Sequence, residues 1–208
     1  MADQLFLEGV GAPPSGSDRL FFAVLPDDYA ASQADRFRQR FCNERGLTGT
    51  PVRTEHLHVT LHHLGDHAGV PQHMVARAAE VAAALRVAPF EVEFDSVVSS
   101  VRGPQNTVAL MLAGDKGMAA LTAFQRALAV AMIKGGLGQW VDKTFAPHMT
   151  LVYEPHLIEK QSIRPISWTV RELVLIHSVL GQMRHVALGR WPLYGSATSG
   201  MPEGEWKP

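Results

Sequence analysis

Two short stretches of the sequence combine a histidine with a threonine in the same pattern. Residues 58–61 and 148–151 both follow the pattern His-x-Thr-Leu, and His148 lies 90 residues after His58. Side chains at positions i and i+2 of a β-strand project from one face, so each histidine is expected to point the same way as its threonine. A single copy of so short a motif is more often a polar strand facing solvent, but two copies in matching positions favour a shared site.

The four side chains suit a reaction with two proton transfers at a tetrahedral, anionic centre. Histidine titrates near neutral pH, so one imidazole can remove a proton from water or a hydroxyl group while the other protonates the departing oxygen. The hydroxyl groups of Thr60 and Thr150 can donate hydrogen bonds to the non-bridging oxygens of a phosphoryl group. The pattern therefore predicts phosphoryl chemistry, with His58 and His148 as the acid–base pair.

The elements that must position the two motifs also repeat. A short apolar strand at 20–25 is followed by a helix and then by the strand that carries the first motif. A second apolar strand at 107–112, a helix that ends at 135–136 and the second motif repeat this order. We therefore predict two lobes of one design, related by a pseudo-twofold axis that brings the two histidine strands face to face.

The remaining elements are predicted from capping residues, apolar spacing and turn residues. The first helix is expected to begin at Asp27 or Asp28 and to bury a stripe that includes Tyr29. A loop bounded by prolines is expected after the second motif. Further predicted segments are a helix from Pro71 to about Leu85, a strand at 90–99, β-rich segments at 167–178 and 183–193, a hairpin turn at 102–105 and a turn at 181–182.

Composition limits the class of protein. The chain has 208 residues, of which 46% are hydrophobic, and 19 basic residues stand against 20 acidic ones. This content suffices for a core, but a nucleic-acid clamp held by bulk positive charge is excluded. The single cysteine, Cys42, is expected to be buried, and it excludes an internal disulfide framework and fits a reducing compartment. Without a secretory signal or an apolar run of about 18 residues, we expect a cytoplasmic protein that binds no membrane.

The stretches HLHVTLHHLGD and FAPHMTLVYE resemble the twin signatures of the 2H phosphoesterases. The similarity is greatest to the branch called 2′–5′ RNA ligase or RNA 2′,3′-cyclic phosphodiesterase. It extends over residues 19–194 and includes the ending ELVLIHSVLGQMRHVALGRWPL. We accordingly expect a flexible arm at 1–18, one bilobal domain at 19–194 and a loose tail at 195–208.

The resemblance implies an α/β (α+β) fold of two pseudo-symmetric lobes. In that fold antiparallel β-sheets line a central V-shaped cleft and the helices lie outside. It also implies that His58, Thr60, His148 and Thr150 are the catalytic residues of a phosphodiesterase that needs no metal or cofactor. Its substrates would be RNA ends or small cyclic nucleotides, opened from the 2′,3′-cyclic phosphate to the 2′-phosphate, and some members also join RNA through 2′–5′ bonds. His148 is assigned as the base and His58 as the acid, with the reverse assignment left open.

Four further residues are candidates for substrate binding. His62 shares a strand face with the first motif by parity, and His63 stands where relatives usually carry an aromatic residue. Tyr153 stands where a basic residue is frequent, and it fits either a substrate contact or the core. His185 replaces a common tyrosine and is either a substrate contact or peripheral.

Two other interpretations compete with this one. His56, His58 and His62 on one strand face are a pattern that zinc or iron can use, but Glu55 and Asp66 are expected to point away from that face. The other interpretation is a non-catalytic module that binds nucleotides or RNA in the same cleft. Three arginines could contact phosphates, but solvent exposure is the better expectation for each, namely Arg164, Arg171 and Arg184. The turn that begins at Arg102 could line the mouth of the cleft, but a plain turn is the better expectation.

Overall fold

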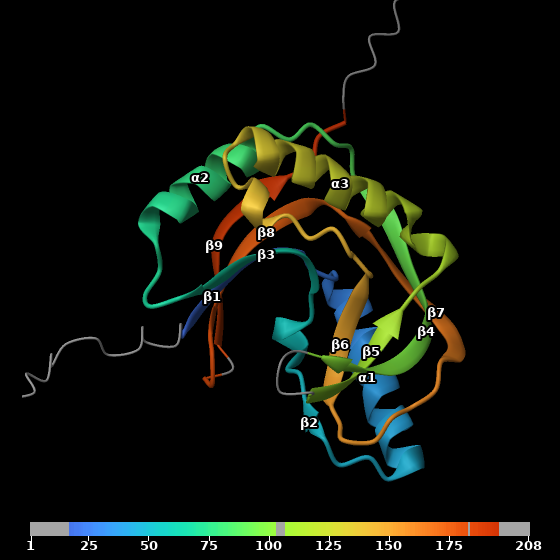
Figure 1. Cartoon of the computed structure of the whole chain (residues 1–208). Helices are drawn as coiled ribbons and strands as arrows, with labels where there is room; N and C mark the ends of the chain where they lie inside the picture. The colour runs from blue at the N-terminus through green and yellow to red at the C-terminus, as the bar shows by residue number, and fades with distance from the viewer. Residues whose placement is uncertain (1–16, 103–106, 183, 196–208) are drawn as a thin grey trace, which may run out of the picture.

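Two antiparallel β-sheets and three helices make up the structure, a computed structural model that describes residues 17–102, 107–182 and 184–195 (Figure 1). The four-stranded sheet has the order β3-β1-β8-β9. Its strands are β1 (Asp18–Val24), β3 (Val59–His67), β8 (Glu172–Val179) and β9 (Arg184–Pro192). The five-stranded sheet has the order β2-β6-β5-β4-β7. Its strands are β2 (Thr50–Pro51), β4 (Phe90–Arg102), β5 (Thr107–Ala113), β6 (His148–Tyr153) and β7 (Gln161–Val170).

The two sheets repeat one arrangement, which confirms the predicted pair of pseudo-symmetric lobes. In each sheet the strand that carries the motif pairs with the leading strand of its half, β3 with β1 and β6 with β5. Strands β8 and β9 then extend the first sheet as β4 and β7 extend the second. The lobes are not contiguous in the chain, because β4 from the first half completes the second sheet and the C-terminal strands complete the first.

The three helices lie on the outside of the sheets (Figure 1). Helix α1 (Asp28–Arg45) packs against β6 and β7, α2 (Gln72–Ala83) against β8 and β9, and α3 (Ala119–Lys134) against α2, β3 and β4. The side chain of Asp27 caps α1 by accepting a hydrogen bond from the backbone N–H of Ala30 at 2.8 Å. The predicted apolar stripe is buried at Ala30, Ala34 and Phe41, but the expected burial of Tyr29 is wrong, since this residue is 68% exposed.

The β-rich segment predicted at 167–178 contains parts of two strands that belong to different sheets. Strand β7 ends at Val170 and pairs with β4, whereas β8 begins at Glu172 and pairs with β1. The chain crosses between the lobes at Arg171, a change of partner that a continuous apolar pattern does not reveal. Strand β7 also begins at Gln161, within the segment where a loop bounded by prolines was expected.

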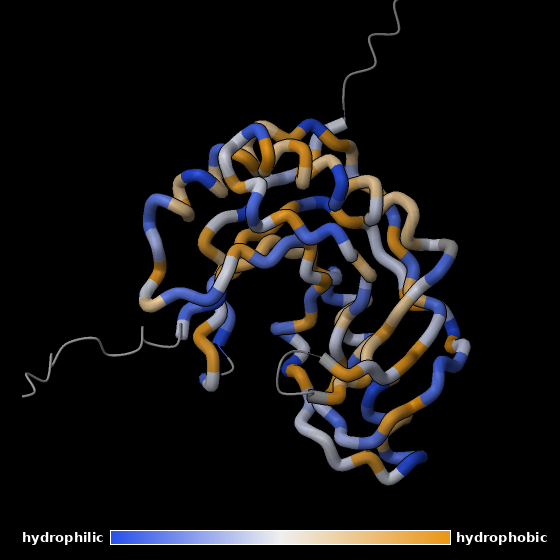
Figure 2. Tube along the Cα trace, in the orientation of Figure 1, coloured by the Kyte–Doolittle hydropathy of each residue, from blue (hydrophilic) through white to orange (hydrophobic). Residues whose placement is uncertain are grey.

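One large apolar core joins the two lobes. Phe22 from the first sheet, Phe94 from the second and Phe124 from α3 are all buried in it. Hydrophobic and hydrophilic residues alternate along much of the strands, as Figure 2 shows, so each sheet presents an apolar face to this core. Cys42 is buried as expected. Among the described residues no helix is both long and apolar enough to cross a membrane.

Each motif strand contains a β-bulge directly after its threonine. In β3, Phe22 pairs with His62 and Ala23 with Thr60, so Leu61 has no partner of its own. In β6, the register shifts in the same way at Leu151. The residue after each bulged leucine is also buried, so the alternation of faces inverts in both strands. These matched bulges decide which residues beyond the motifs face the space between the lobes.

Candidate active site

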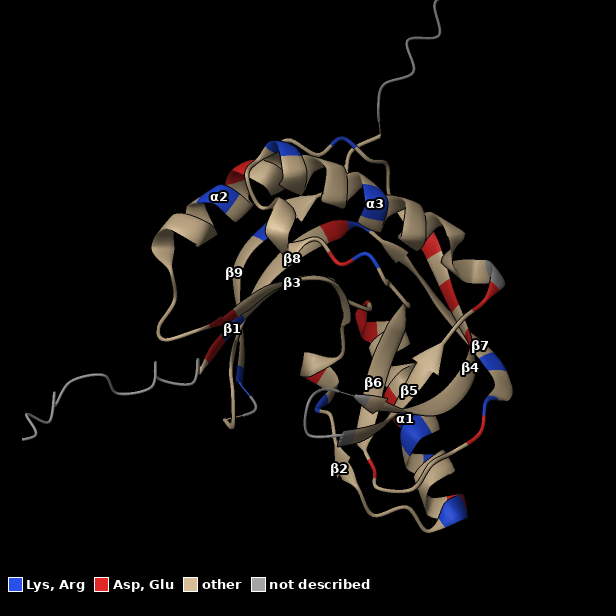
Figure 3. Cartoon of the chain, in the orientation of Figure 1, with Lys and Arg blue, Asp and Glu red and all other residues tan. Residues whose placement is uncertain are grey.

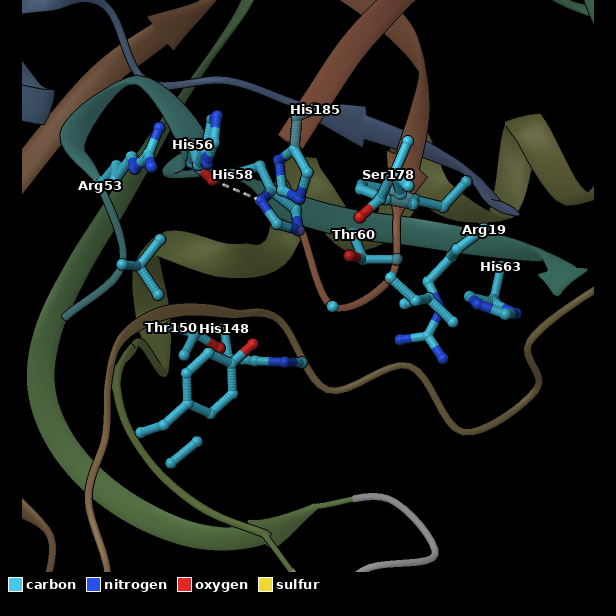
Figure 4. Close-up of a pocket in the computed structure, with 17 residues that line it drawn as sticks. Arg19, Arg53, His56, His58, Thr60, His63, His148, Thr150, Ser178 and His185 are labelled. Carbon is cyan, nitrogen blue, oxygen red and sulfur yellow. Dashed lines mark hydrogen bonds between the residues drawn. The ribbon is translucent and has the colours of Figure 1, made fainter. Parts of the chain in front are cut away.

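The two motifs line one cavity of about 370 Å³ between the lobes (Figure 4). His58 and Thr60 reach it from the first lobe, and His148 and Thr150 reach it from the second. All four side chains are partly buried, whereas the residues between them point into the core. The structure thus brings together the residues of two motifs that are 90 positions apart in the sequence.

The two motif histidines are oriented by the same hydrogen bond. The Nδ1 atom of His58 lies 2.7 Å from the backbone oxygen of His56, and Nδ1 of His148 lies 2.8 Å from that of Ala146. A carbonyl oxygen only accepts, so Nδ1 carries a hydrogen in both rings, and proton exchange with a substrate falls to Nε2. The motifs therefore supply two imidazoles in the same tautomer, one on each wall of the cavity.

The environment of His58 favours its neutral form in the substrate-free cavity. Burial lowers the pKa of His58 most, and the neighbouring His148 and His56 lower it further, against a smaller opposing effect of the hydrogen bond to the His56 carbonyl. Two imidazolium ions facing each other would repel, so the pair favours one proton at a time. A bound anion would raise the pKa of His58 again, because its negative charge stabilises the protonated ring.

The threonine hydroxyl groups are placed to donate to a ligand. Thr60 and Thr150 both line the cavity and are half-buried. Within the described part of the chain neither hydroxyl is engaged by another residue. Two donors on opposite walls can hold two non-bridging oxygens of one phosphoryl group.

His185 lies in the cavity wall and is not peripheral. It extends from β9, and its ring centroid lies 5.3 Å from that of His58 and 4.5 Å from that of His56. Burial and these two neighbouring histidines lower the pKa of His185 to about 4. Its ring is therefore neutral at physiological pH and offers a flat surface and a hydrogen-bonding nitrogen instead of a positive charge.

The assignment of His62 to the cavity wall is wrong. His62 is completely buried, with Nε2 donating to the backbone oxygen of Gln125 at 3.1 Å and Nδ1 accepting from the N–H of Asp142 at 3.1 Å. The bulge at Leu61 turns this residue inward and turns His63 toward the cavity. One sequence signal was present: Leu64 is apolar at the parity opposite to Val59 and Leu61, so the alternation must break between them.

The second bulge has the same effect on Tyr153. This residue follows two consecutive buried residues, is 47% exposed and lines the cavity, so it is not part of the core. His63 and Tyr153 therefore occupy equivalent positions in the two lobes, again 90 residues apart. His177, in contrast, has a structural contact, with Nε2 2.6 Å from a carboxylate oxygen of Asp18.

Three polar residues of the cavity wall were not foreseen from the sequence. Arg19, Arg53 and Ser178 line it together with the motifs. Arg19 shares its strand face with Phe21, which also lines the cavity, so strand parity relative to the first lobe's apolar strand was the available signal. The side chains of Arg164, Arg171 and Arg184 are exposed and lie outside this cavity, and the expected turn at 102–105 falls mostly outside the described residues.

The alternative interpretation of the histidine cluster as a zinc or iron site depends on which acidic side chains lie near the cavity. Glu55 lines a separate surface groove, and Asp66 does not line the cavity itself, although its carboxylate lies 3.3 Å from Nε2 of the wall residue His63. Among the described residues, no group of three or more His, Cys, Asp or Glu side chains is close enough to hold a metal ion. In the view of Figure 3, charges of both signs are interspersed over the helices and strand edges.

Known structures share this fold over most of its length. E. coli LigT complexed with NADP+ is 26% identical, with a TM-score of 0.64, and the match covers 86% of this chain and 99% of that one. E. coli LigT complexed with 3′-AMP gives the same values. The protein TT0787 of Thermus thermophilus is 20% identical with a TM-score of 0.66, over 85% of this chain and 98% of that one, and supports the fold alone.

Sequence comparisons address the family directly. No curated protein matches the chain when full sequences are compared. The family model for the 2′-5′ RNA ligase superfamily matches residues 26–182, a range that contains both motifs and most of the cavity wall. The cavity, with its paired histidines and threonines, the shared fold and this match agree: the chain is a 2H phosphoesterase of the 2′-5′ RNA ligase superfamily.

Proposed function

We propose that this enzyme hydrolyses 2′,3′-cyclic phosphates of RNA ends or nucleotides to 2′-phosphates without a metal ion. The observation that carries the proposal is the pair of equally oriented histidines on opposite walls of one cavity, each beside a threonine hydroxyl. A cyclic phosphodiester needs a base on one side of phosphorus and an acid on the other, and it carries one negative charge for the hydroxyl groups to hold.

The reaction divides between the two lobes. Nε2 of His148 takes a proton from water, whose oxygen forms the new bond to phosphorus. The bond from phosphorus to the 3′ oxygen breaks, and Nε2–H of His58 gives its proton to that oxygen. Thr60 and Thr150 donate hydrogen bonds to the non-bridging oxygens throughout.

This assignment requires His58 to be protonated when substrate is bound. Burial lowers its pKa in the empty cavity, and the anionic phosphate supplies the compensating charge. The protonated acid is thus formed together with the complex. The family also supports 2′–5′ ligation, in which the same two histidines would exchange roles.

The test is incubation of the purified protein with adenosine 2′,3′-cyclic phosphate and identification of the product. We expect adenosine 2′-phosphate, formed equally well after treatment with a chelator, and formed at least about 100-fold more slowly by the His148→Ala variant. The 3′-phosphate as product would contradict the assigned leaving oxygen. Activity lost to chelation and restored by zinc would establish the metal interpretation, and binding without any turnover would establish a non-catalytic module.

A further inference from the structure

We infer, on the basis of the proposed function, that Arg19 binds the 5′-phosphate of the nucleotide that carries the cyclic phosphate. Arg19 extends from β1 into the cavity, and its guanidinium is held by Asp66 of the neighbouring strand. Its Nε and Nη2 atoms donate to the two carboxylate oxygens of Asp66 at 2.7 and 2.8 Å. This paired contact fixes the plane of the guanidinium before any ligand arrives.

The hydrogen bonds to Asp66 leave most donors of Arg19 available. A guanidinium has five N–H groups, and the carboxylate uses two of them. No further partner engages Arg19 within the described residues, and its side chain is 40% exposed. Asp66 also raises the pKa of Arg19, chiefly through its hydrogen bonds, so the positive charge is permanent. The remaining donors can therefore meet an anion in the cavity.

The position of Arg19 relative to the motifs fits one nucleotide length. Figure 4 shows the guanidinium beside His63, on the side of Thr60 that faces away from His56 and Arg53. His63 lies three positions after Thr60 along β3, which corresponds to roughly 7–10 Å at the rise of a β-strand. The 3′ and 5′ phosphorus atoms of a single nucleotide are separated by a distance near the lower end of this range. A cyclic phosphate held at Thr60 would place its own nucleotide's 5′-phosphate near Arg19.

The groups around Arg19 suit the rest of that nucleotide. Tyr153 on the opposite lobe lies near enough to interact electrostatically with Arg19, and its half-exposed ring offers a surface on which a base can stack. Nε2 of His63 lies 3.3 Å from the same Asp66 carboxylate. Burial and the charge of Arg19 lower the pKa of His63, so this ring is neutral. Arg19 is consequently the one permanent cation at this end of the cavity among the residues described.

The experiment compares three substrates that differ in the 5′ group. Adenosine 2′,3′-cyclic phosphate has a 5′ hydroxyl, its 5′-phosphorylated form adds one phosphate, and the dinucleotide ApA 2′,3′-cyclic phosphate adds a phosphodiester and a nucleoside. We expect kcat/KM to be about tenfold higher for both phosphate-bearing substrates, in line with one charge-assisted contact. A higher value for the 5′-phosphorylated mononucleotide than for the dinucleotide would point to free nucleotides, and the reverse order to RNA ends.

Variants then test whether Arg19 causes the preference for substrates with a 5′-phosphate. The Arg19→Gln variant should lower this preference, the ratio of kcat/KM for a phosphate-bearing substrate to kcat/KM for the 5′-hydroxyl substrate, to about one. Asp66→Asn should give an intermediate preference, because the guanidinium remains but is no longer fixed. Arg164→Gln removes the same charge from the exposed β7 surface and should leave the preference unchanged. If Arg19→Gln does not fold, Arg19→Lys keeps the charge and should give an intermediate preference.

Other outcomes would overturn the inference without touching the proposed function. Equal losses on all three substrates in Arg19→Gln would place Arg19 on the cyclic phosphate itself. A higher kcat/KM for the dinucleotide alone would show that the preceding nucleoside, and not the 5′-phosphate, makes the favourable contact. The absence of turnover of any of the three substrates by the wild-type protein would instead refute the proposed function.

Discussion

At the scale of single residues, the site depends on how two identical motifs are held. Each motif histidine donates Nδ1–H to the backbone oxygen two residues earlier, so both rings have the same tautomer and the same orientation relative to their strand. The bulge after each threonine then adds a third residue to the cavity wall, His63 in one lobe and Tyr153 in the other. The lobes are therefore equivalent in acid–base groups and different in what they offer a substrate beyond the phosphate.

Removal of the motif residues should separate proton transfer from phosphate binding. His58→Ala and His148→Ala should each lower kcat by about 10²–10⁴-fold, because each removes one of the two proton-transfer groups. Thr60→Ala and Thr150→Ala should lower kcat/KM by only about tenfold, because the second hydroxyl still holds the phosphoryl group. Steady-state kinetics on the cyclic nucleotide measure both. The wild-type pH profile should be bell-shaped, and a histidine variant with near-normal kcat would contradict the mechanism.

The two adjacent histidines of β3 should behave in opposite ways. His62→Ala should lower the free energy of unfolding by about 2–4 kcal/mol, since it opens a cavity and leaves the Gln125 carbonyl and the Asp142 N–H without partners. His63→Ala, on the exposed side, should change stability by less than about 1 kcal/mol and affect substrate kinetics instead. Urea titrations of both variants provide the comparison, and a destabilised His63→Ala with an unchanged His62→Ala would show that the bulge is absent.

Substrate binding should take up a proton at His58. The pKa of this histidine is lowered in the empty cavity, chiefly by burial, and an anionic phosphodiester raises it, so binding is coupled to protonation and should strengthen as pH falls from about 8 to about 6. Calorimetry of the inactive His148→Ala variant with cyclic nucleotide, in buffers of different ionisation enthalpy, measures the uptake. The double variant His58→Asn/His148→Ala should show none, and undiminished uptake there would assign the proton to another group.

At the scale of elements, a buried carboxylate joins the edge strand β2 to the second lobe. Glu154 follows β6 and accepts hydrogen bonds from the N–H of Gly49 at 2.9 Å and of His156 at 3.2 Å. Gly49 has no room for a side chain, since an added Cβ would lie 2.3 Å from the Tyr153 carbonyl oxygen. This connection holds the segment that contributes Val52 and Arg53 to the cavity.

The Glu154 contact should make stability depend on acidic pH. Burial raises the pKa of Glu154, but the hydrogen bonds from His156 and Gly49 outweigh it and hold the pKa below its usual value. Because the folded-state pKa is lowered, the contribution is complete above the ordinary glutamate pKa of about 4.3 and is lost as pH falls below it. Glu154→Ala should cost about 1–3 kcal/mol at pH 7 by urea titration. The exposed Glu159→Gln serves as the control and should be neutral.

At the scale of the whole molecule, the lobes share strands and a core and should unfold together. Strand β4 belongs to the first half of the chain and to the second sheet, and the large core includes residues of both sheets and all three helices. Fluorescence of single-tryptophan variants that keep Trp168 in β7 or Trp191 in β9 should give the same urea midpoint as far-UV circular dichroism. Two separate midpoints would show that the lobes fold independently.

The arrangement of the lobes and the residues of the two motifs could be predicted from the sequence alone. The repeated order of apolar strand, helix and motif predicted two equivalent lobes, and the His-x-Thr pattern placed both side chains of each motif on one face, since strand parity is a local property. Tertiary structure alone decided which residues flank the motifs. A bulge depends on how two strands pair, so it cannot be read from one strand. The bulge in β3 turns His62 into the core and places His63 in the cavity wall in its stead. Strand parity places Arg19 on the same face as Phe21, but its contact with Asp66, 47 residues later, depends on the antiparallel pairing of β1 with β3, which no local pattern encodes.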